Sequence, residues 1–539
     1  MFRPFVKRDT GGQVSEPRHS VTAQTLDDSV RRAPPFSARK RLFMASLLFA
    51  FLFPYLTWKQ AAGGALLLLL FNTLILPWLD VDLSKQLWTG GGPSRKREGP
   101  IRGEGTTHLQ TRVVLYPISV LALIVLYRNH LAIAAAAWAI MALGDGMATV
   151  VGEAARRQLV AGRQAQETTA EILLRRPTDQ NDKGRAQHDR VHPNSLRLWR
   201  GKLGATLPWN RQKTWAGFLS FVIAGTVGAY VLTRWIAPEI PPQRTLMVCA
   251  AGSLLGAVIE SLPIALDDNI TVPLVVGTFM FCAFLVERSA LESNLPYLGR
   301  RIVLAIGVNL AFALLACAAG AASRSGAVCG FLLGTAIYLG YGYKSFLLLF
   351  AFVLLGSVAT RLGFAKKAAR GIAERMGGAR SWRQALANLL AAAFFAVLVI
   401  TTHHEPAFLI ALVAALAEAA GDTVSSEIGQ WASDRAYLIT TFRLVAAGED
   451  GGISLAGTAA GFAASATITG LGLGLGLCGP YRFAGAAIAL GAAVAGNLLD
   501  SFLGATIQRR GLITNGMVNF VGTSVAGGLA LGLALHLGL

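Results

Sequence analysis

Acidic residues interrupt the apolar runs of this sequence at a few places, and these residues are the ones that could do chemistry. The clearest case is the stretch GDGMATVVGE, which puts Asp145 between Gly144 and Gly146 at the end of an apolar run. A carboxylate inside a membrane helix is costly, so it marks a candidate functional site. A second stretch, LPWNRQKTWAG, places Asn210 and Lys213 just before an expected helix start. There a cation and backbone N–H groups can bind phosphate.

A third group of polar residues lies in the stretch ESLPIALDDNITVP, which contains Glu260, Asp267, Asp268 and Asn269. Glu260 and Asp267 are seven residues apart, so they share one face if the helix is continuous. Acids that can hold Mg²⁺, together with a lysine for phosphates, are the minimum set for phosphoryl or nucleotidyl transfer. The three stretches together therefore predict a site for this class of reaction.

The first stretch has a fainter copy, GDTVSSEIGQ, which begins at Gly421 and contains Asp422. In each copy the next helix opens with a similar pentapeptide, KTWAG or ISLAG. Two helices later an acid stands at the inner end, Glu260 in one copy and Asp500 in the other. These matches predict two parallel copies of a seven-helix unit, joined by one linker helix that restores the orientation.

The composition indicates the class of protein. Of the 539 residues, 53% are hydrophobic and only 15% are charged, and the mean hydropathy is +0.50. These values indicate a polytopic membrane protein. The net charge of +19 lies in the loops, which is typical of the cytoplasmic side of membrane proteins, so no nucleic acid is expected as a partner. The five cysteines have no metal-ligand spacing, and neither disulfides nor a zinc site is expected.

The apolar runs predict an all-α polytopic fold with about fifteen transmembrane helices. With a cytoplasmic N-terminus, every strongly basic loop falls on the cytoplasmic side. The acids gather at the cytoplasmic ends of their helices, which favours a site that faces cytosolic solutes over a transport path. The predicted parts are a disordered basic cytoplasmic tail (1–41), a membrane domain (42–290, with a cytoplasmic insert at about 156–206), a linker helix (291–321) and a second membrane domain (322–539).

The first half resembles the phytol kinase and dolichol kinase group, which is related to phosphatidate cytidylyltransferases. The resemblance rests on GDGMATVVGE, PWNRQKTWAG and ESLPIALDDNITVPL and covers about residues 112–290. It implies binding of CTP with Mg²⁺ and phosphorylation of a long isoprenoid alcohol. The sequence departs from this group in the long insert and at Thr214, where a serine is common.

The second half resembles the family that contains transmembrane protein 19 and the plant phytyl-phosphate kinase. The stretches that carry the resemblance span nearly all of 322–537: SRSGAVCG, ATRLGFAKKAARG, GGARSWRQALAN, GDTVSSEIG, LITTFR, GEDGGISLAGT, GNLLDSFLGATIQ and NGMVNF. The resemblance implies phosphorylation of an isoprenyl monophosphate to the diphosphate. In this half Ile453 stands at the position of Lys213, and neighbouring loops supply other cations that could clamp phosphate. These cations are Arg361, Lys366, Lys367, Arg380 and Arg443.

We therefore expect a bifunctional membrane kinase that converts an isoprenoid alcohol to its diphosphate in two Mg²⁺-dependent steps, with CTP or another nucleoside triphosphate as donor. In the first half the expected metal and nucleotide residues are Asp145, Glu260, Asp267 and Asp268, with Lys213 at the phosphates and Gly144, Gly146, Asn210 and Asn269 beside them. In the second half the expected acids are Asp422, Glu427, Asp450 and Asp500, with Asn388, Asn497, Asn515 and Asn519 as polar support. Asp422 and Glu427 are five apart, so they do not share a helix face unless the helix unwinds.

Two other functions stay open at this level. A cytidylyltransferase would use similar motifs but attack the α-phosphate and release pyrophosphate. A transporter built from parallel repeats would place polar residues through the middle of the bilayer. The expected partners are the lipid bilayer, the isoprenoid alcohol and its monophosphate, and the nucleotide. The expected location is a bacterial inner membrane, with a plastid envelope as the alternative.

Overall fold

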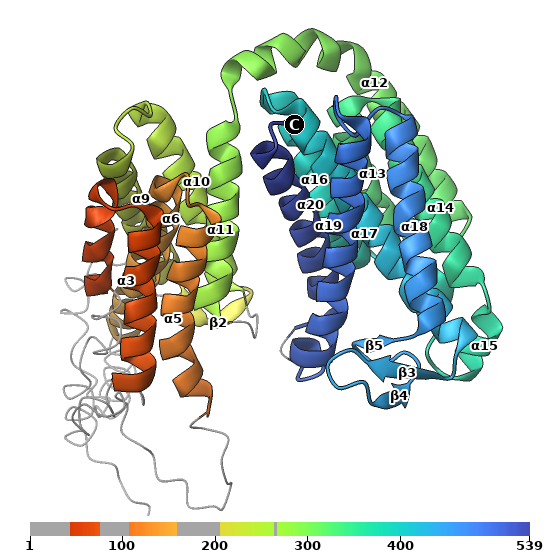
Figure 1. The fold of residues 1–539 in the computed structure, drawn as a ribbon, viewed down its shortest axis with the longest axis horizontal. Coiled ribbons are helices and arrows are strands. Elements are labelled where there is room, and N and C mark those ends of the chain that lie inside the picture. The colour runs from red at the N-terminus through yellow and green to blue at the C-terminus, as the bar shows by residue number, and fades with distance from the viewer. Residues whose placement is uncertain (1–43, 76–106, 159–204, 263–266, 374, 512) are drawn as a thin grey trace, which may run out of the picture.

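The computed structural model describes residues 44–75, 107–158, 205–262, 267–373, 375–511 and 513–539. The predicted tail and most of the predicted insert lie outside these ranges. The described chain is mostly helical, and its helices form two bundles that lie side by side (Figure 1). The first bundle lies within residues 44–285 and the second within residues 324–536, while the predicted division into two membrane domains stays a prediction.

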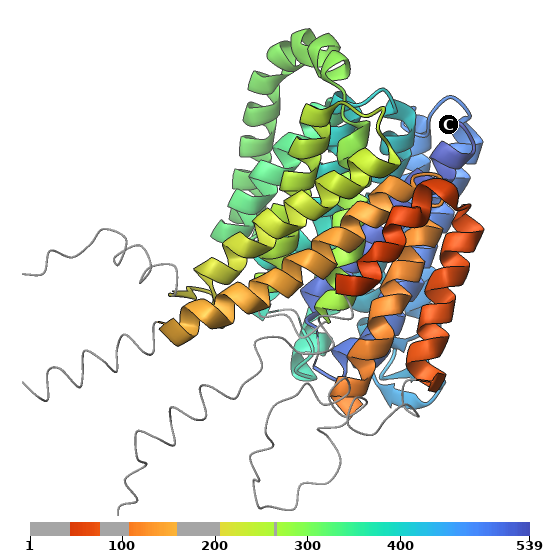
Figure 2. The ribbon, with the colours of Figure 1, turned by 90° about the vertical axis from the view of Figure 1, so that its left-hand side faces the viewer.

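The first bundle surrounds one long helix. Its elements are η1 (Leu47–Tyr55), α3 (Trp58–Leu70), η2 (Phe71–Ile75), α5 (Thr107–Leu126), α6 (Leu131–Ala139), η4 (Ile140–Asp145), β1 (Thr206–Leu207), β2 (Asn210–Thr214), α9 (Trp215–Ile236), α10 (Pro242–Ser261) and α11 (Asp268–Leu285). The helix that begins as α6 continues through η4 to Gln158, and 72% of its apolar part is buried. It reaches the end of the bundle that carries β2 (Figure 2). Its buried alanines, Ala134 to Ala137, allow the neighbouring helices to approach closely.

The second bundle has the same organisation around α17. Its elements are α13 (Arg324–Tyr341), α14 (Tyr343–Arg361), α15 (Phe364–Ala369), η5 (Arg375–Gly378), α16 (Trp382–Thr401), α17 (Glu405–Ala432), β3 (Arg435–Leu438), β4 (Leu444–Ala446), β5 (Gly452–Ile453), α18 (Leu455–Gly474), α19 (Arg482–Leu503), η6 (Gly504–Gln508) and α20 (Asn515–His536). In α17, 89% of the apolar part is buried, because α14, α16, α18, α19 and α20 all pack against it. In both bundles the central helix is therefore the one with the Gly-Asp pair.

The linker is a single helix, α12 (Arg288–Ala318), of 31 residues. It arches over the end of the molecule opposite the strands and then descends along α13 (Figure 1). Ten helices of the described chain, α12 among them, are long and apolar enough to cross a membrane. These features are consistent with a polytopic membrane protein, while the larger number of about fifteen spans and the cytoplasmic N-terminus stay predictions.

Two small sheets are features that the all-α prediction did not include. β1 and β2 form an antiparallel hairpin directly before α9, and β3 pairs with both β4 and β5 between α17 and α18. Both sheets lie at the same end of the two bundles (Figure 1). Each therefore follows the central helix of its bundle and precedes the next helix.

Candidate active sites

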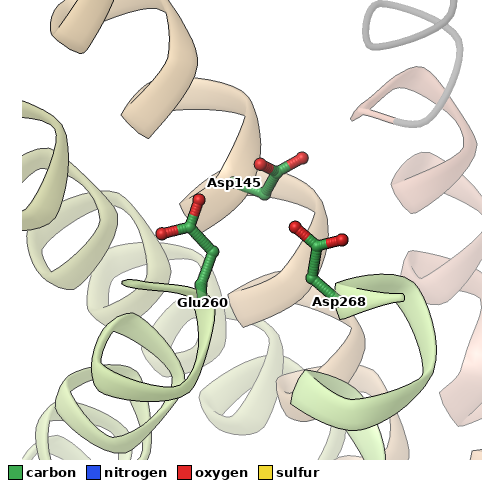
Figure 3. A group of neighbouring side chains, drawn as sticks. All are labelled: Asp145, Glu260 and Asp268. Carbon is green, nitrogen blue, oxygen red and sulfur yellow. The ribbon is translucent and has the colours of Figure 1, made fainter. Parts of the chain in front are cut away.

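Three acids from three separate helical segments meet in the first bundle. Their carboxylate oxygens lie within 4.8 Å of one another (Figure 3). Asp145 ends the π-helical turn η4, Glu260 lies one residue before the end of α10, and Asp268 is the first residue of α11. A π-helical turn inside an α-helix is frequent at functional sites. Three carboxylates this close repel one another, so the arrangement requires positive charge nearby.

Lys213 supplies positive charge to this acid cluster. Its Nζ forms an ion pair with Glu260, whose side chain is only 4% exposed. Burial lowers the pKa of Lys213, but the charges of Glu260, Asp145 and Asp268 outweigh this effect, so the pKa lies above its ordinary value. The ammonium group is therefore protonated at neutral pH. It lies beside the three acids, at a position where it can also attract a bound phosphate group.

The β1–β2 hairpin positions this lysine. Asn210 donates from Nδ2 to the Ser261 carbonyl oxygen at 3.0 Å, and Trp209 donates from Nε1 to Ser261 Oγ at 3.1 Å. Both bonds attach the hairpin to the end of α10, next to Glu260. The predicted residues Asn210 and Lys213 therefore lie beside the acid cluster, and Asn210 contributes by fixing the hairpin to the end of α10.

The structure assigns the neighbouring aspartates differently from the sequence. The condition for Glu260 and Asp267 to share a face, one continuous helix, is not met, because α10 ends at Ser261 and α11 begins at Asp268. Asp267 is the N-cap of α11, and its Oδ1 accepts from the backbone N of Asn269 at 2.9 Å and from its Nδ2 at 2.6 Å. Asp268, and not Asp267, completes the group of three acids. The predicted residue Asn269 thus holds the capping aspartate.

Gly144 and Gly146 serve packing in the described structure. A methyl group at Gly144 would lie 2.8 Å from the ring of Phe221 on α9. At Gly146 it would lie 2.8 Å from the sulfur of Met44. Both distances are shorter than a normal carbon contact, so a larger residue at either position would push the Asp145 helix away from its neighbours.

In the second bundle, the predicted residues gather around a polar pocket of about 550 Å³, part of it open to the surroundings. The six predicted residues that line it are Arg380, Asn388, Asp422, Glu427, Asn515 and Asn519. Asn519 donates from Nδ2 to Asp422 Oδ2 at 3.0 Å and to Asn388 Oδ1 at 3.2 Å, which connects α20 with α17 and α16. Asp422 and Glu427 border one pocket although α17 stays helical between them.

Glu427 is a counter-ion in this pocket. Its carboxylate accepts from Lys367 Nζ at 2.6 Å and from Thr360 Oγ1 at 2.8 Å, and Arg380 Nη2 lies 3.6 Å away. Arg380 also donates to Thr360 Oγ1 at 3.1 Å. Lys367 is fully buried by these contacts and lines neither pocket of this bundle. Arg380 is thus the predicted cation that reaches the pocket, and Glu427 fixes its position.

The remaining predicted residues of the second half do not line the polar pocket, although Asp500 interacts electrostatically with Asp422, which does. Arg361 donates to the Ala319 carbonyl oxygen, Lys366 donates to the Trp431 carbonyl oxygen, and Arg443 is exposed in the turn between β3 and β4. Asp450 accepts from Gln508 Nε2 at 2.8 Å, and Asn497 lies 3.5 Å from Ser465 Oγ. Asp500 lies in α19 and does not line the pocket.

The sequence analysis missed Glu418, which lies one helical turn before Asp422 on α17. Its side chain is fully buried, and among the residues that the structure describes neither of its carboxylate oxygens has a hydrogen-bond partner. Its space exists because two neighbouring helices carry glycines there: a methyl group at Gly496 or Gly522 would overlap the Glu418 side chain. An acid within an apolar run was a signal visible in the sequence. The residue four positions before Asp145 is Met141, so the first bundle has no acid at this place.

The helix after each small sheet crosses the central helix at glycines. In the first bundle a methyl group at Gly152 would lie 3.1 Å from Thr214 Oγ1 and 3.5 Å from the Gly217 Cα. Thr214 is the N-cap of α9 and accepts from the Gly217 backbone N at 3.1 Å. Thr214, which stands where the resembled kinase group commonly has serine, therefore still provides a side-chain hydroxyl that caps the helix.

The second bundle has the same crossing. A methyl group at Gly429 would lie 3.0 Å from Ser454 Oγ and 3.6 Å from the Gly457 Cα. Ser454 is the N-cap of α18 and accepts from the Gly457 backbone N at 3.1 Å. In both bundles the glycine on the central helix follows the Gly-Asp pair by the same number of residues. The glycine on the next helix also follows its N-cap residue by the same number of residues.

Comparisons with known proteins agree with a membrane protein of this kind. Uncharacterized membrane protein MJ0933 of Methanocaldococcus jannaschii is 37% identical over 189 residues, which are 34% of this chain and 74% of that protein. Protein VTE6, chloroplastic, of Arabidopsis thaliana is 35% identical over 216 residues, 39% of this chain and 64% of that protein. Phytol kinase 1, chloroplastic, of Arabidopsis thaliana is 36% identical over 90 residues, 15% of this chain and 30% of that protein.

No solved structure matches the chain significantly. Residues 307–528 match the family described as "Integral membrane protein DUF92". The match begins inside α12 and includes α13 to α19 and more than half of α20, so it covers the second bundle with both its sheet and its polar pocket. With this match and the similarity to most of MJ0933, the chain belongs to the integral membrane protein family DUF92.

Proposed function

We propose that this protein is a membrane kinase with two sites, which converts an isoprenoid alcohol to its diphosphate by two successive phosphoryl transfers. The observation that carries the proposal is the acid cluster of Asp145, Glu260 and Asp268 with Lys213 among its charges. The partial similarity to phytol kinase 1 supports an alcohol as the first acceptor. The two matching helix crossings support the predicted duplication of the unit.

The donor set of the first bundle fits a divalent cation. Mg²⁺ prefers oxygen ligands and is usually held by one or two carboxylates together with substrate phosphates. Asp145, Glu260 and Asp268 would hold it, and the bound ion would neutralise charge on the nucleotide phosphates. In the second bundle Asp422 would supply a carboxylate and Asn388 an amide oxygen at the edge of the polar pocket.

The residues of the first bundle would position the reactants and balance the charge. Lys213 would contact the nucleotide phosphates, since its ammonium is fixed by the hairpin and by Glu260. The alcohol oxygen would attack the γ-phosphorus, the bond from that phosphorus to the bridging oxygen would break, and the nucleoside diphosphate would leave. A carboxylate of the acid cluster would accept the hydroxyl proton.

In the second bundle the acceptor is already a phosphate. Arg380 would bind it, because a guanidinium offers several N–H donors in a planar fork and can keep its contacts to Thr360 and Glu427 at the same time. Asp422, held by Asn519, would lie beside the transferred group. The donor is a nucleoside triphosphate, CTP by the resemblance of the first half, and the membrane is a bacterial inner membrane or a plastid envelope with both sites on the cytoplasmic or stromal side.

The test is a lipid kinase assay on the full chain purified in detergent. Geranylgeraniol or phytol would be incubated with Mg²⁺ and either γ-labelled or α-labelled CTP or ATP, and the lipid products separated. We expect labelled monophosphate to accumulate in Asp422→Asn and both products to be lost in Asp145→Asn. Glu239→Gln, which removes an exposed acid in the α9–α10 loop, should behave like the wild type.

Two results would contradict the proposal. Transfer of α-label to a lipid with release of pyrophosphate would identify a cytidylyltransferase. No labelled lipid with any alcohol or donor, while added isoprenyl monophosphate is also not consumed, would exclude the kinase and favour the transporter with parallel repeats.

A further inference from the structure

The second bundle contains an apolar pocket that meets the polar one. It encloses about 780 Å³, part of it open to the surroundings, and lies between α12, α13, α14, α16 and α17. The residues that border both pockets are Arg380, Gln384, Asn388 and Thr423. The two pockets are therefore adjacent, one apolar and one polar, and they share this part of their walls.

We propose that the apolar pocket binds the isoprenyl chain of a lipid monophosphate, while its phosphate lies against Arg380 in the polar pocket. The inference rests on the proposed second transfer and names the part of the molecule that selects the substrate. An anionic head and an apolar tail match the order of the two pockets, because among the described residues the only charged one that lines the apolar pocket is Arg380, which also lines the polar pocket.

The walls of the apolar pocket suit a methyl-branched chain. Much of the lining consists of alanine and glycine, with Phe312 of α12 and Phe352 of α14 as the large side chains. On α13, Gly326 contacts the Arg380 backbone, and Gly330 follows one turn later, about 6 Å further from the arginine. A methyl group at Gly330 would meet nothing within 4 Å, so this glycine leaves open space in the pocket.

The pocket acts by shape more than by affinity. A chain that enters from the bilayer leaves surroundings as apolar as the pocket, so burying it brings little hydrophobic free energy. Binding strength must then come from the phosphate and Arg380. The shape of the pocket decides which isoprenyl chains allow the phosphate to lie correctly. Because α12 forms part of its wall, this linker helix also contributes to substrate selection.

The test compares two substitutions on two prenyl monophosphates. Gly330→Leu fills the pocket, whereas Gly470→Leu is the matched control on α18, where a side chain also meets nothing within 4 Å and which lines neither pocket. Isopentenyl monophosphate has one prenyl unit and geranylgeranyl monophosphate has four, so only the long substrate must extend far along the apolar pocket. For Gly330→Leu we expect kcat/KM with the long substrate to fall about tenfold or more, since a methylene-sized misfit in an apolar pocket costs roughly 10–200-fold.

The short substrate should change little in Gly330→Leu, and both substrates should change little in Gly470→Leu. A photoreactive geranylgeranyl monophosphate analogue should crosslink to α12 and α13 in the wild type and lose this crosslink in Gly330→Leu. Equal turnover and equal crosslinking in both variants would overturn the tail pocket and assign the space to a bilayer acyl chain. Absence of turnover of any prenyl monophosphate by the wild type, in contrast, would refute the proposed second transfer itself.

Discussion

Lys213→Met gives the sharpest test of the first site, because it removes one charge from a cluster whose geometry is known. Breaking a buried ion pair from one side costs about 3–5 kcal/mol in the free energy of unfolding. The Lys213 side chain is 34% exposed while that of Glu260 is 4% exposed. Water therefore replaces part of the lost interaction, and the expected loss of stability is about 1–3 kcal/mol.

The effect on the reaction should be larger than the effect on stability. Removal of one group that stabilises charge in a transition state lowers kcat by about 10²–10³. The first transfer, measured as label moved from nucleotide to isoprenoid alcohol, should fall by this factor. Lys213 competes with Mg²⁺ for the acid cluster. The first transfer by Lys213→Met should therefore reach half of its own maximal rate at a lower Mg²⁺ concentration than in the wild type.

Arg211→Met is the matched control, since it removes a cation from the same strand at an exposed position. It should leave the first transfer nearly unchanged. Phosphorylation of added isoprenyl monophosphate should be normal in both variants, because the polar pocket of the second bundle contains neither residue. The reasoning fails if Lys213→Met and Arg211→Met lower the first transfer equally, or if Lys213→Met requires more Mg²⁺ than the wild type.

Three further outcomes follow from the second bundle. Glu427→Gln should destabilise the protein by about 3–5 kcal/mol, because it leaves the buried Lys367 without its counter-ion, and adding Lys367→Met should restore thermal stability in detergent. Gly457→Ala should lower the free energy of unfolding by about 1–3 kcal/mol, because its methyl group would lie 2.6 Å from a backbone oxygen of α17. Gly470→Ala is the control and should not lower the melting temperature, because a methyl group there meets open space. Glu418→Met should raise the melting temperature, because a buried acid whose oxygens lack a hydrogen-bond partner among the described residues carries an uncompensated desolvation cost of about 1–3 kcal/mol, which methionine avoids; an unchanged or lower value would show that this acid has a partner in the functional protein.

The sequence predicted much of the first site because its residue types are unusual in their surroundings. Asp145 and Glu260 stand out as acids in apolar runs, and Lys213 stands out before a helix start. The choice between Asp267 and Asp268 was beyond the sequence, since it depends on which of two adjacent carboxylates turns back to cap the helix. Side-chain direction at a helix end is set by local geometry that the spacing of residues does not reveal.

The second site was harder to predict for a different reason. Six of the residues that line its polar pocket were named, yet other acids and cations of the same loops were named with them, because charge and spacing alone do not show which ones face inward. The two- to five-residue strands are too short to produce an alternating pattern. The apolar pocket arises where α12 meets α13 and α16, and the polar pocket arises where α16, α17 and α20 meet. No local pattern reports the packing of helices that are distant in the chain.

The central position of α17 also has a consequence for how the protein is made. Ribosomes release the chain from its N-terminus, so α17 enters the membrane before α18, α19 and α20 exist to cover it. The lysine and arginine that contact Glu427 precede it in the chain and can meet it at once. Asp422, in contrast, waits for Asn519, which is 97 residues further on and at roughly 5–20 residues per second emerges several seconds later. During that interval its carboxylate faces lipid, the insertion machinery or the half-built bundle, and a pause in synthesis between α17 and α20 would prolong this most exposed stage of assembly.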